Sequence, residues 1–159
     1  MKNLWYQKFP IGKLGVIEEN NQITRIFFEN KRELIDNYVI LNTNLINETL
    51  NQLNEYFAGS RKFFNLPLAL KGTIFQEKVW SALQRIPFGK TLSYKEVAAR
   101  IDSPNSSRAV GNANNKNPIA IVIPCHRVIG HNGELSGYAG GLDAKRYLLE
   151  LENIKINKI

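Results

Sequence analysis

Short runs of branched and aromatic side chains, separated by polar turns, mark the first third of the chain. Residues 14–17 and 22–28 are two such runs, and the pair Asn20 and Asn21 between them is typical of a tight turn. Residues 38–41 form a third apolar run. Runs of this length and composition predict β-strands. The chain therefore begins as a small sheet.

A helical repeat follows the predicted strands. The hydrophobic residues that recur at helical spacing are Ile46, Leu50, Leu53 and Phe57. This spacing predicts one buried face of an amphipathic helix, which Gly59 ends. Residues 63–68 form an extended segment, because Pro67 is excluded from a helix interior. We predict an α/β domain over residues 1–65 and a domain boundary between residues 60 and 70.

Two helix starts open the second half of the chain. Each has a hydroxyl residue with a glutamine or glutamate three positions later: Thr73 with Gln76, and Ser93 with Glu96. Such capping boxes fix the first turn of a helix. Phe75, Val79 and Leu83 then share one face of the first helix, which ends before Pro87. The second helix runs through Arg100.

A turn over residues 102–105 leads to a third helix from about residue 106 to 115. Two short helices joined by a tight turn predict a helix-turn-helix, a common DNA-binding unit. Ala109, Gly111 and Ala113 give this helix an exposed face of small residues. Glycine within a helix lowers stability by about 1 kcal/mol relative to alanine. Close approach to a nucleic-acid groove or to a neighbouring helix would compensate, and both remain open.

Composition limits the class of protein. The 159 residues are 43% hydrophobic and 22% charged, as in a globular chain of one domain or two small ones. No apolar run is long enough to cross a membrane, and the first eight residues lack the apolar segment of a signal peptide. A single cysteine excludes an internal disulfide and a cysteine-rich zinc site. We expect a cytoplasmic protein that uses neither a membrane nor a metal.

The net charge of +7 is unevenly spread along the chain. Residues 71–116 carry eight basic and three acidic side chains, a net charge of +5, and the remaining residues together carry +2. This concentration of charge predicts contact with a polyanion, most simply a phosphate backbone. A solvated basic face without a partner fits the same pattern.

The only cysteine stands beside one of the two histidines, in the segment Pro-Cys-His-Arg-Val over residues 124–128. The apolar run over residues 119–123 predicts a buried strand that ends at Cys125, and a glycine-rich run over residues 137–141 follows. A reactive side chain at a strand end, with a flexible loop nearby, is typical of a nucleophile. A small buried hydrophobic cysteine is the alternative.

A cysteine nucleophile needs a base, because the thiolate is the reactive form and free cysteine has a pKa of about 8.5. His126 is the candidate base. Neighbouring residues of a regular strand point to opposite faces, so a turn or a bridging water is needed between Cys125 and His126. The other histidine, His131, lies in a polar turn and has no predicted catalytic role.

Four blocks of the second half match one family in order and spacing. They are Ser-Arg-Ala-Val-Gly-Asn-Ala over residues 107–113, Asn-Pro over 117–118, Ile-Pro-Cys-His-Arg-Val over 123–128, and Gly-Tyr-Ala-Gly-Gly-Leu over 137–142. Together they resemble the O6-alkylguanine-DNA alkyltransferases, the methylated-DNA–protein-cysteine methyltransferases. The resemblance covers residues 71–152 and, more loosely, the first half, where it implies a ribonuclease-H-like α/β domain. For residues 71–159 it implies a mainly α domain with a winged-helix-like helix-turn-helix.

The resemblance implies DNA repair by direct reversal of damage. Such a protein flips an O6-alkylguanine out of double-stranded DNA and moves the alkyl group irreversibly to its own cysteine, here Cys125. O4-methylthymine is a further candidate substrate. The thioether product is inert, so each molecule reacts once, as a suicide methyltransferase. The resemblance also implies a monomer that needs no cofactor.

Catalytic roles around the cysteine follow from the same resemblance. A relay would run from Cys125 through a water to His126 and then to Glu152, which ends a helix predicted over residues 142–151. Without the resemblance, Glu152 is more simply a solvated carboxylate at a helix end. Tyr94 would assist flipping and protonate N3 of the leaving guanine, or else it is a core tyrosine.

DNA-binding and pocket residues also follow from the resemblance. Arg108 would enter the base stack as an arginine finger, with a plain phosphate contact as the alternative. The third helix would lie in the minor groove through Ala109, Gly111, Asn112 and Ala113. The alkyl pocket would be lined by Val128, Tyr138, Ala139, Gly140 and Gly141. Asn117 would order the turns around the site. Because other members carry a polar or larger residue in place of Ala139, the preference between methyl and bulky adducts stays open.

Three other classes of protein share parts of this pattern. A non-enzymatic binder of alkylated DNA has the same fold but lacks the cysteine, which is present here at position 125. A helix-turn-helix transcription factor with a buried cysteine would have an operator sequence and slow thiol chemistry. A cysteine hydrolase usually keeps its base remote in sequence, and no oxyanion-hole motif is present. The sequence therefore favours the alkyltransferase.

Overall fold

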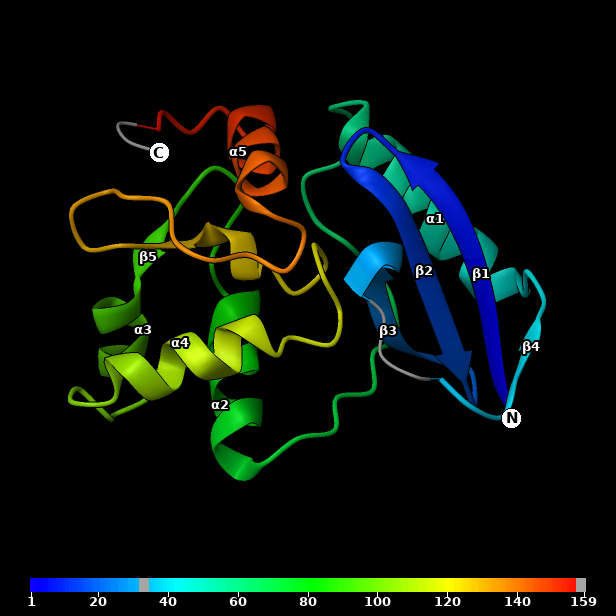
Figure 1. Ribbon diagram of the computed structural model, residues 1–159, viewed down its shortest axis with the longest axis horizontal. Helices are drawn as coiled ribbons and strands as arrows, with labels where there is room; N and C mark the ends of the chain where they lie inside the picture. The colour runs from blue at the N-terminus through cyan, green and yellow to red at the C-terminus, as the bar shows by residue number, and fades with distance from the viewer. Residues whose placement is uncertain (32–34, 157–159) are drawn as a thin grey trace. The chain divides into compact units, whose positions relative to one another are not determined.

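The computed structural model describes residues 1–31 and 35–156, which fall into two compact units. The first unit comprises Met1–Leu70 with Pro118–Ala120, and the second comprises Lys71–Asn117 with Ile121–Ile159. Figure 1 labels their helices and strands, and the first unit is α/β while the second is mainly helical, as the sequence predicted. Within the described residues, no helix is long and apolar enough to span a membrane.

A four-stranded sheet is the centre of the first unit. β1 (Lys2–Phe9), β2 (Gly12–Glu19) and β3 (Gln22–Phe28) are antiparallel neighbours. β4 (Tyr38–Ile40) pairs with β1 in parallel, which gives the order β3-β2-β1-β4. A short 3-10 helix, η1 (Glu29–Lys31), follows β3.

The strands predicted over residues 14–17 and 22–28 are confirmed within β2 and as β3, and the stretch predicted over 38–41 is confirmed as β4 except for its last residue, Leu41. Asn20 and Asn21 join β2 to β3 with φ angles of 51° and 63°, a left-handed conformation that asparagine adopts more readily than most residues. β1 was not predicted. Only Leu4 and Phe9 of its eight residues are buried, so its apolar signal is too sparse to identify a strand.

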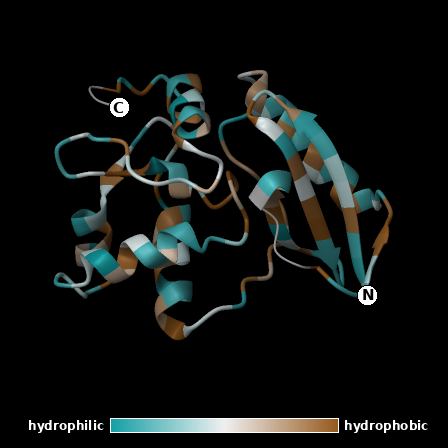
Figure 2. Ribbon diagram, in the orientation of Figure 1, coloured by the Kyte–Doolittle hydropathy of each residue, from teal (hydrophilic) through white to brown (hydrophobic). Residues whose placement is uncertain are grey.

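α1 (Asn44–Phe57) packs on β1, β2 and β3, and Figure 1 shows it lying along the sheet. In Figure 2, hydrophobic and hydrophilic residues are interspersed along both the strands and the helix, as expected for elements with one buried face. The predicted helix is confirmed, and three of its predicted apolar residues are buried: Ile46, Leu50 and Leu53. Tyr56 is the fully buried aromatic residue, and Phe57 is only half-buried.

Residues 119–123 do not form the buried strand that the sequence predicted. Ile119 makes a single parallel bridge to Ile26 of β3, and two backbone hydrogen bonds of 3.0 Å flank it. The extended segment stops there because Ile121 has a φ of 72°, in the left-handed region that a β-branched residue rarely occupies. The apolar run therefore reflects burial, because Ile121 and Ile123 are both buried. It does not indicate a strand.

Among the described residues, the second unit has four α-helices and a two-stranded parallel ladder. In chain order the elements are α2 (Ile74–Gln84), β5 (Leu92–Ser93), α3 (Tyr94–Arg100), α4 (Ser107–Asn115), η2 (Cys125–Arg127), β6 (Val128–Ile129) and α5 (Leu142–Leu151). Both predicted capping boxes are present, at the start of α2 and at the start of α3. Because each box satisfies exposed backbone N–H groups, it fixes where its helix begins.

The predicted helix-turn-helix consists of α3 and α4, and its turn passes through Asp102 with a φ of 59°. α2 packs against both helices, and Nε1 of Trp80 donates a hydrogen bond of 2.9 Å to the carbonyl oxygen of Ala113. Ala113 is only 3% exposed. The prediction that it lies on an exposed, DNA-facing side of the third helix is therefore wrong, because it shares the buried face with Val110, three residues earlier.

Candidate active site

A tight 3-10 turn, η2, holds the cysteine and the two residues after it. The backbone N–H of Cys125 donates to the carbonyl of Ile123 at 2.8 Å, and that of Arg127 donates to the carbonyl of Pro124 at 2.9 Å. Cys125, His126 and Arg127 are buried, with exposed fractions of 6%, 0% and 6%. The turn replaces the regular strand considered above, so the side chains of Cys125 and His126 need not point to opposite faces.

The imidazole of His126 contacts a buried carboxylate. Its Nε2 lies 2.7 Å from Oε2 of Glu152, which caps the C-terminal end of α5 and is 2% exposed. A carboxylate accepts, so Nε2 carries the hydrogen and Nδ1 keeps its lone pair. Within residues 1–31 and 35–156, Nδ1 is buried without a hydrogen-bond partner. Glu152 is therefore not the solvated helix-end carboxylate that its position alone suggested.

Arg127 holds the same carboxylate on its other side. Its Nε donates to Oε1 of Glu152 at 2.8 Å, and its Nη2 donates to Oε2 at 3.0 Å. Its Nη1 donates to the carbonyl of Ile86 at 2.7 Å, and the backbone N–H of Gly89 donates to Oε1 at 3.2 Å. This bidentate, charge-assisted arrangement fixes the plane of the carboxylate against His126.

These contacts set the charges of Glu152 and His126. Burial alone would raise the pKa of Glu152, but the hydrogen bonds and charges of His126 and Arg127 outweigh it and lower that pKa to about 2. Burial lowers the pKa of His126 below its ordinary value, although the contact with Glu152 opposes the shift. At neutral pH the site therefore contains a carboxylate, a guanidinium and a neutral imidazole that can accept a proton.

Cys125 is a thiol in this environment. Burial raises its pKa, and a hydrogen bond with the side chain of Asn117 and the charge of Lys145 act in the opposite direction. Formation of the reactive thiolate therefore requires a base, and His126, the next residue, carries the available lone pair.

Two asparagines support the cysteine turn. Nδ2 of Asn117 donates to the carbonyl of Ile123 at 2.7 Å, and Nδ2 of Asn114 donates to the carbonyl of Cys125 at 3.3 Å. Asn114 is on the buried face of α4, and its Oδ1 has no hydrogen-bond partner among the described residues. The backbone around Cys125 is thus held by α4 and by the segment that directly follows it.

A second polar chain runs from α3 to α5. The hydroxyl groups of Tyr94 and Ser136 are hydrogen-bonded to each other, and Nζ of Lys145 donates to the carbonyls of Val128 at 2.7 Å and Ser136 at 3.0 Å. Burial raises the pKa of Tyr94, the Ser136 hydrogen bond opposes that shift, and a thiolate at Cys125 adds to it. Burial lowers the pKa of the fully buried Lys145 to about 8.

The predicted pocket residues differ in their surroundings. Val128 is fully buried, and the half-buried ring of Tyr138 meets the His126 imidazole edge-on, with ring centroids 6.5 Å apart. Gly140 is half-buried, whereas Ala139 and Gly141 are exposed. Gly141 has a φ of 94° and precedes the first residue of α5. The structure thus brings Val128 and Tyr138 to the cysteine turn and leaves Ala139 at the surface.

Of the five residues of α4 predicted to face DNA, three are exposed, one is half-buried and one, Ala113, is buried. Arg108, Ala109 and Asn112 are exposed, whereas Gly111 is half-buried. A Cβ at Gly111 would lie 3.7 Å from the ring of Tyr94. This is an ordinary van der Waals distance, so an alanine would also fit at position 111, and packing against Tyr94 at the start of α3 does not by itself require glycine.

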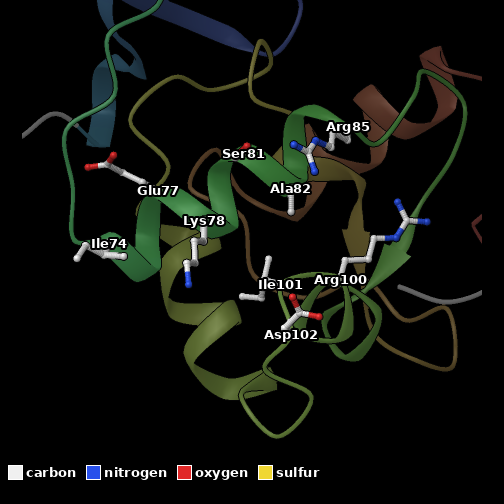
Figure 3. A pocket seen from close by; sticks show the side chains of 9 residues that line it. All are labelled: Ile74, Glu77, Lys78, Ser81, Ala82, Arg85, Arg100, Ile101 and Asp102. Atoms are coloured by element: carbon white, nitrogen blue, oxygen red, sulfur yellow. The ribbon is translucent and has the colours of Figure 1, made fainter.

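A surface hollow of about 500 Å³ lies between α2 and the C-terminal end of α3, apart from the residues around Cys125. Three of its residues are basic, Lys78, Arg85 and Arg100, and Figure 3 shows their charged ends pointing in different directions. Glu77 and Asp102 also line it. This mixed lining selects no class of ligand. In the described part of the chain, no three His, Cys, Asp or Glu side chains are grouped to hold a metal ion.

Comparison with known proteins gives two family matches that together cover almost the whole chain. Residues 74–154 match the 6-O-methylguanine DNA methyltransferase DNA-binding domain, and residues 5–70 match the ribonuclease-like domain of the same family. The chain belongs to the 6-O-methylguanine DNA methyltransferase family. The predicted family and the predicted fold class, a ribonuclease-H-like α/β domain followed by a helix-turn-helix domain, are both confirmed.

Relatives in this family resemble the chain along most of their length. The constitutive methylated-DNA–protein-cysteine methyltransferase of Bacillus subtilis is 48% identical over 151 residues, 91% of this chain and 92% of the relative. The Methanosarcina barkeri enzyme is 56% identical over 145 residues, with 90% and 92% covered. Among solved structures, a Mycobacterium tuberculosis protein in complex with DNA has a TM-score of 0.90 at 43% identity, and covers 94% of this chain and 92% of its own.

Four residues in contact with the candidate site were not predicted from the sequence: Arg127, Lys145, Asn114 and Ser136. Lys145 had a detectable signal, because it lies with Ala144, Leu148 and Leu149 on the apolar face of α5, where a lysine is out of place. Arg127 was visible beside His126 but had no identified partner. Asn114 and Ser136 gave no local signal, since both act through contacts with distant segments.

Proposed function

We propose that the protein repairs O6-alkylguanine in double-stranded DNA by transferring the alkyl group irreversibly to Cys125. One observation carries the proposal. The buried thiol of Cys125 is followed by a neutral imidazole whose Nε2 is bound by Glu152 and whose Nδ1 has no partner among the described residues. A base oriented in this way beside a buried thiol is arranged to generate a thiolate.

The proton moves first. A water molecule between the two side chains accepts the thiol proton of Cys125 and passes a proton to Nδ1 of His126. This step leaves a thiolate and an imidazolium, and Glu152 stabilises the imidazolium because its own pKa of about 2 keeps it ionised. Assistance is needed because burial raises the pKa of Cys125.

The alkyl group moves second. Sγ of Cys125 attacks the alkyl carbon in line with its bond to O6, so the S–C bond forms as the C–O bond breaks and the electron pair remains on guanine. Tyr94 donates its proton to N3 of the guanine. The proton held by His126 then passes through solvent to the Tyr94 phenolate. Burial raises the pKa of Tyr94, which keeps the phenol protonated at neutral pH. The thioether is stable, so each molecule acts once and needs no cofactor.

α4 binds DNA in this proposal. Arg108 is exposed and fills the gap that the flipped nucleotide leaves in the base stack. Ala109, Gly111 and Asn112 allow the helix to lie close to the minor groove. Ala113 is not part of this surface, because it is buried.

The pocket for the flipped base uses residues near the cysteine turn. Val128 and Tyr138 line its inner side, and Ala139, Gly140 and Gly141 form its outer edge. Asn117 holds the turn through its hydrogen bond to Ile123. A pocket closed on one side by small residues suits a methyl group and leaves room for larger adducts.

Residues 71–159 carry both DNA binding and alkyl transfer in this proposal, and residues 1–65 form a ribonuclease-H-like domain without chemistry of its own. The net charge of +5 over residues 71–116 favours association with DNA. We infer that the protein acts as a monomer in the cytoplasm, and that O4-methylthymine is a second substrate. The curated relatives are named for methylated DNA and a protein cysteine, which is the same pair of reactants.

The test is the intact mass of the protein after mixing with double-stranded DNA that contains one O6-methylguanine, followed by peptide mapping. A gain of one methyl group on Cys125, with no further gain at excess DNA, is the expected result. Lesion-selective binding without any gain of mass would indicate a damage sensor. Binding without preference for the lesion would leave only a helix-turn-helix protein.

A further inference from the structure

Lys145 is a buried cation that the proposed chemistry does not use. It is fully buried on α5, and its Nζ donates to the carbonyls of Val128 at 2.7 Å and Ser136 at 3.0 Å. In the described part of the chain, no carboxylate forms an ion pair with it. A buried ammonium that is compensated only by carbonyl dipoles lowers the stability of the fold, so its presence requires a reason.

The two carbonyls belong to different sides of the site. Val128 directly follows the turn that holds Cys125, and it starts β6, where it pairs with Leu92 of β5. Ser136 lies in the segment before Tyr138, and its hydroxyl is hydrogen-bonded to the hydroxyl of Tyr94. One ammonium group therefore links the backbone next to Cys125 with the backbone of Ser136, whose hydroxyl is hydrogen-bonded to Tyr94.

We propose that Lys145 is a positioning residue for alkyl transfer, whose ammonium holds the Ser136 segment against the Cys125 turn and so sets the separation of the Cys125 thiol and the Tyr94 phenol. This inference rests on the proposed function, in which Cys125 and Tyr94 act on two different atoms of one guanine. Both groups must be held within a fraction of an ångström of their working positions. Two hydrogen bonds from one buried nitrogen supply that constraint.

The same ammonium acts on the charge of the nucleophile. Burial raises the pKa of Cys125, and the positive charge of Lys145 lowers it. Removal of the charge leaves the thiol harder to ionise. The pKa of Lys145 is about 8, so the ammonium is the main form at neutral pH.

The experiment compares three variants with the wild-type protein. Lys145→Met removes the ammonium and keeps a long apolar side chain, Lys145→Gln keeps an N–H donor without the charge, and Leu148→Met is a matched control on the same buried face of α5. Three quantities are measured: the rate constant for alkyl transfer from free O6-benzylguanine, the pH profile of Cys125 alkylation by iodoacetamide, and the thermal unfolding midpoint.

We expect Lys145→Met to slow transfer from benzylguanine about tenfold or more and to shift the iodoacetamide profile upward by about one pH unit, a tenfold loss of thiolate at fixed pH. Its unfolding midpoint should be unchanged or higher, because an apolar side chain replaces a buried charge that forms no ion pair in the part of the chain that the structure describes. Leu148→Met should keep both the rate and the profile. A role in folding alone cannot produce lower reactivity together with undiminished stability.

Two results would overturn the inference. One is a Lys145→Met protein with the wild-type rate and profile. The other is a Lys145→Met rate constant that falls only as far as a loss of stability explains. If Lys145→Met does not fold, Lys145→Gln decides by the same measurements. If the wild-type protein takes no alkyl group from benzylguanine or from DNA, the proposed function fails, and the iodoacetamide profile then decides the effect of Lys145 on Cys125.

Discussion

The two units of the molecule bury different kinds of side chain. Among the described residues, the buried polar side chains of the first unit are Glu18, Thr49 and Gln52. Those of the second unit are Ser93, Asn114, His126, Arg127, Lys145 and Glu152. Four of these six are ionisable side chains placed around one turn. The first unit is therefore mainly an apolar core, and the second contains a concentrated polar site.

The units also differ in how well their buried polar atoms are satisfied. In the first, Gln52 exchanges two hydrogen bonds with the backbone of Asn65, and Glu18 accepts from Asn3 and from the backbone of Asn21. In the second, Nδ1 of His126 and Oδ1 of Asn114 have no partner among the described residues. Unpaired buried groups lower stability, so they persist where function requires them. The comparison indicates that buried polar groups with hydrogen-bond partners serve stability in the first unit, and that buried polar groups without them serve the proposed chemistry in the second.

The largest predicted effect is at the nucleophile. Replacing Cys125 with Ser or Ala should lower alkyl transfer by at least about a thousandfold, because neither residue supplies a thiolate. Binding to DNA with an O6-methylguanine should persist, since α4 is unchanged. Mass spectrometry measures the transfer and fluorescence anisotropy measures the binding. Appreciable transfer by either variant would refute the role of Cys125.

The second effect concerns the buried charges. Glu152→Gln leaves the guanidinium of Arg127 buried without a countercharge, and the free energy of unfolding should fall by about 3–5 kcal/mol. The matched control in the first unit is Glu18→Gln, whose carboxylate forms no ion pair within the described residues, and the loss there should be only about 1 kcal/mol. Urea denaturation measures both. Equal losses would show that neutralising a buried carboxylate affects the stability of the two units equally.

The contacts of Glu152 with His126 and Arg127 also predict a pH dependence of stability. The pKa of Glu152 is about 2 in the fold and 4.5 in its ordinary state, so the unfolded chain binds more protons between these values. The stabilisation by Glu152 is fully present above about pH 4.5 and is lost as the pH falls through about 2. It amounts to about 3 kcal/mol, from 1.36 kcal/mol for each pKa unit. In Glu152→Gln, this part of the acid unfolding curve should flatten.

A smaller effect is expected on the surface of the second unit. Arg108→Ala should slow repair in double-stranded DNA about tenfold, because the gap in the base stack is left open, and leave the reaction with free O6-benzylguanine unchanged. Lys116→Ala, an exposed cation just after α4, is the control and should weaken binding to any DNA and reduce its salt dependence. Parallel rate constants on the two substrates measure this, and equal loss on both by Arg108→Ala would count against base flipping.

The smallest expected effect compares two buried amides. Gln52→Leu in the first unit removes two hydrogen bonds to Asn65 and should cost about 1–3 kcal/mol. Asn114→Leu in the second unit removes one bond of 3.3 Å together with an oxygen that has no partner among the described residues, and its stability should change by less than about 1 kcal/mol. Thermal unfolding measures both. A larger loss for Asn114→Leu than for Gln52→Leu would contradict the comparison.

Several parts of the molecule could be predicted from neighbouring residues alone. The capping boxes at Thr73 and Ser93 fixed the starts of α2 and α3 because a capping box is complete within four residues. The turn at Asn20 and Asn21 is equally local. The segment around Cys125 combined a unique cysteine with an adjacent histidine, so the nucleophile and its base could be proposed without any structure.

Local patterns failed where distant packing decides the outcome. The apolar run over residues 119–123 looks like a strand, but the left-handed Ile121 ends the pairing after one bridge. Ala113 looked exposed because it is small, and it is buried because α2 packs over it. β1 was missed because a strand can be held by pairing on both sides with few buried side chains of its own.

The sequence by itself determined the candidate residues for the chemistry: one cysteine, the histidine beside it, and a helix-turn-helix in the basic half. Only the tertiary structure decided how those residues are charged and oriented. Glu152 is 26 residues from His126, and Lys145 is 17 residues from Val128, and neither contact has a local signature. Burial and partners set the pKa values of Cys125, His126 and Glu152, and both arise only when segments far apart in the chain pack together.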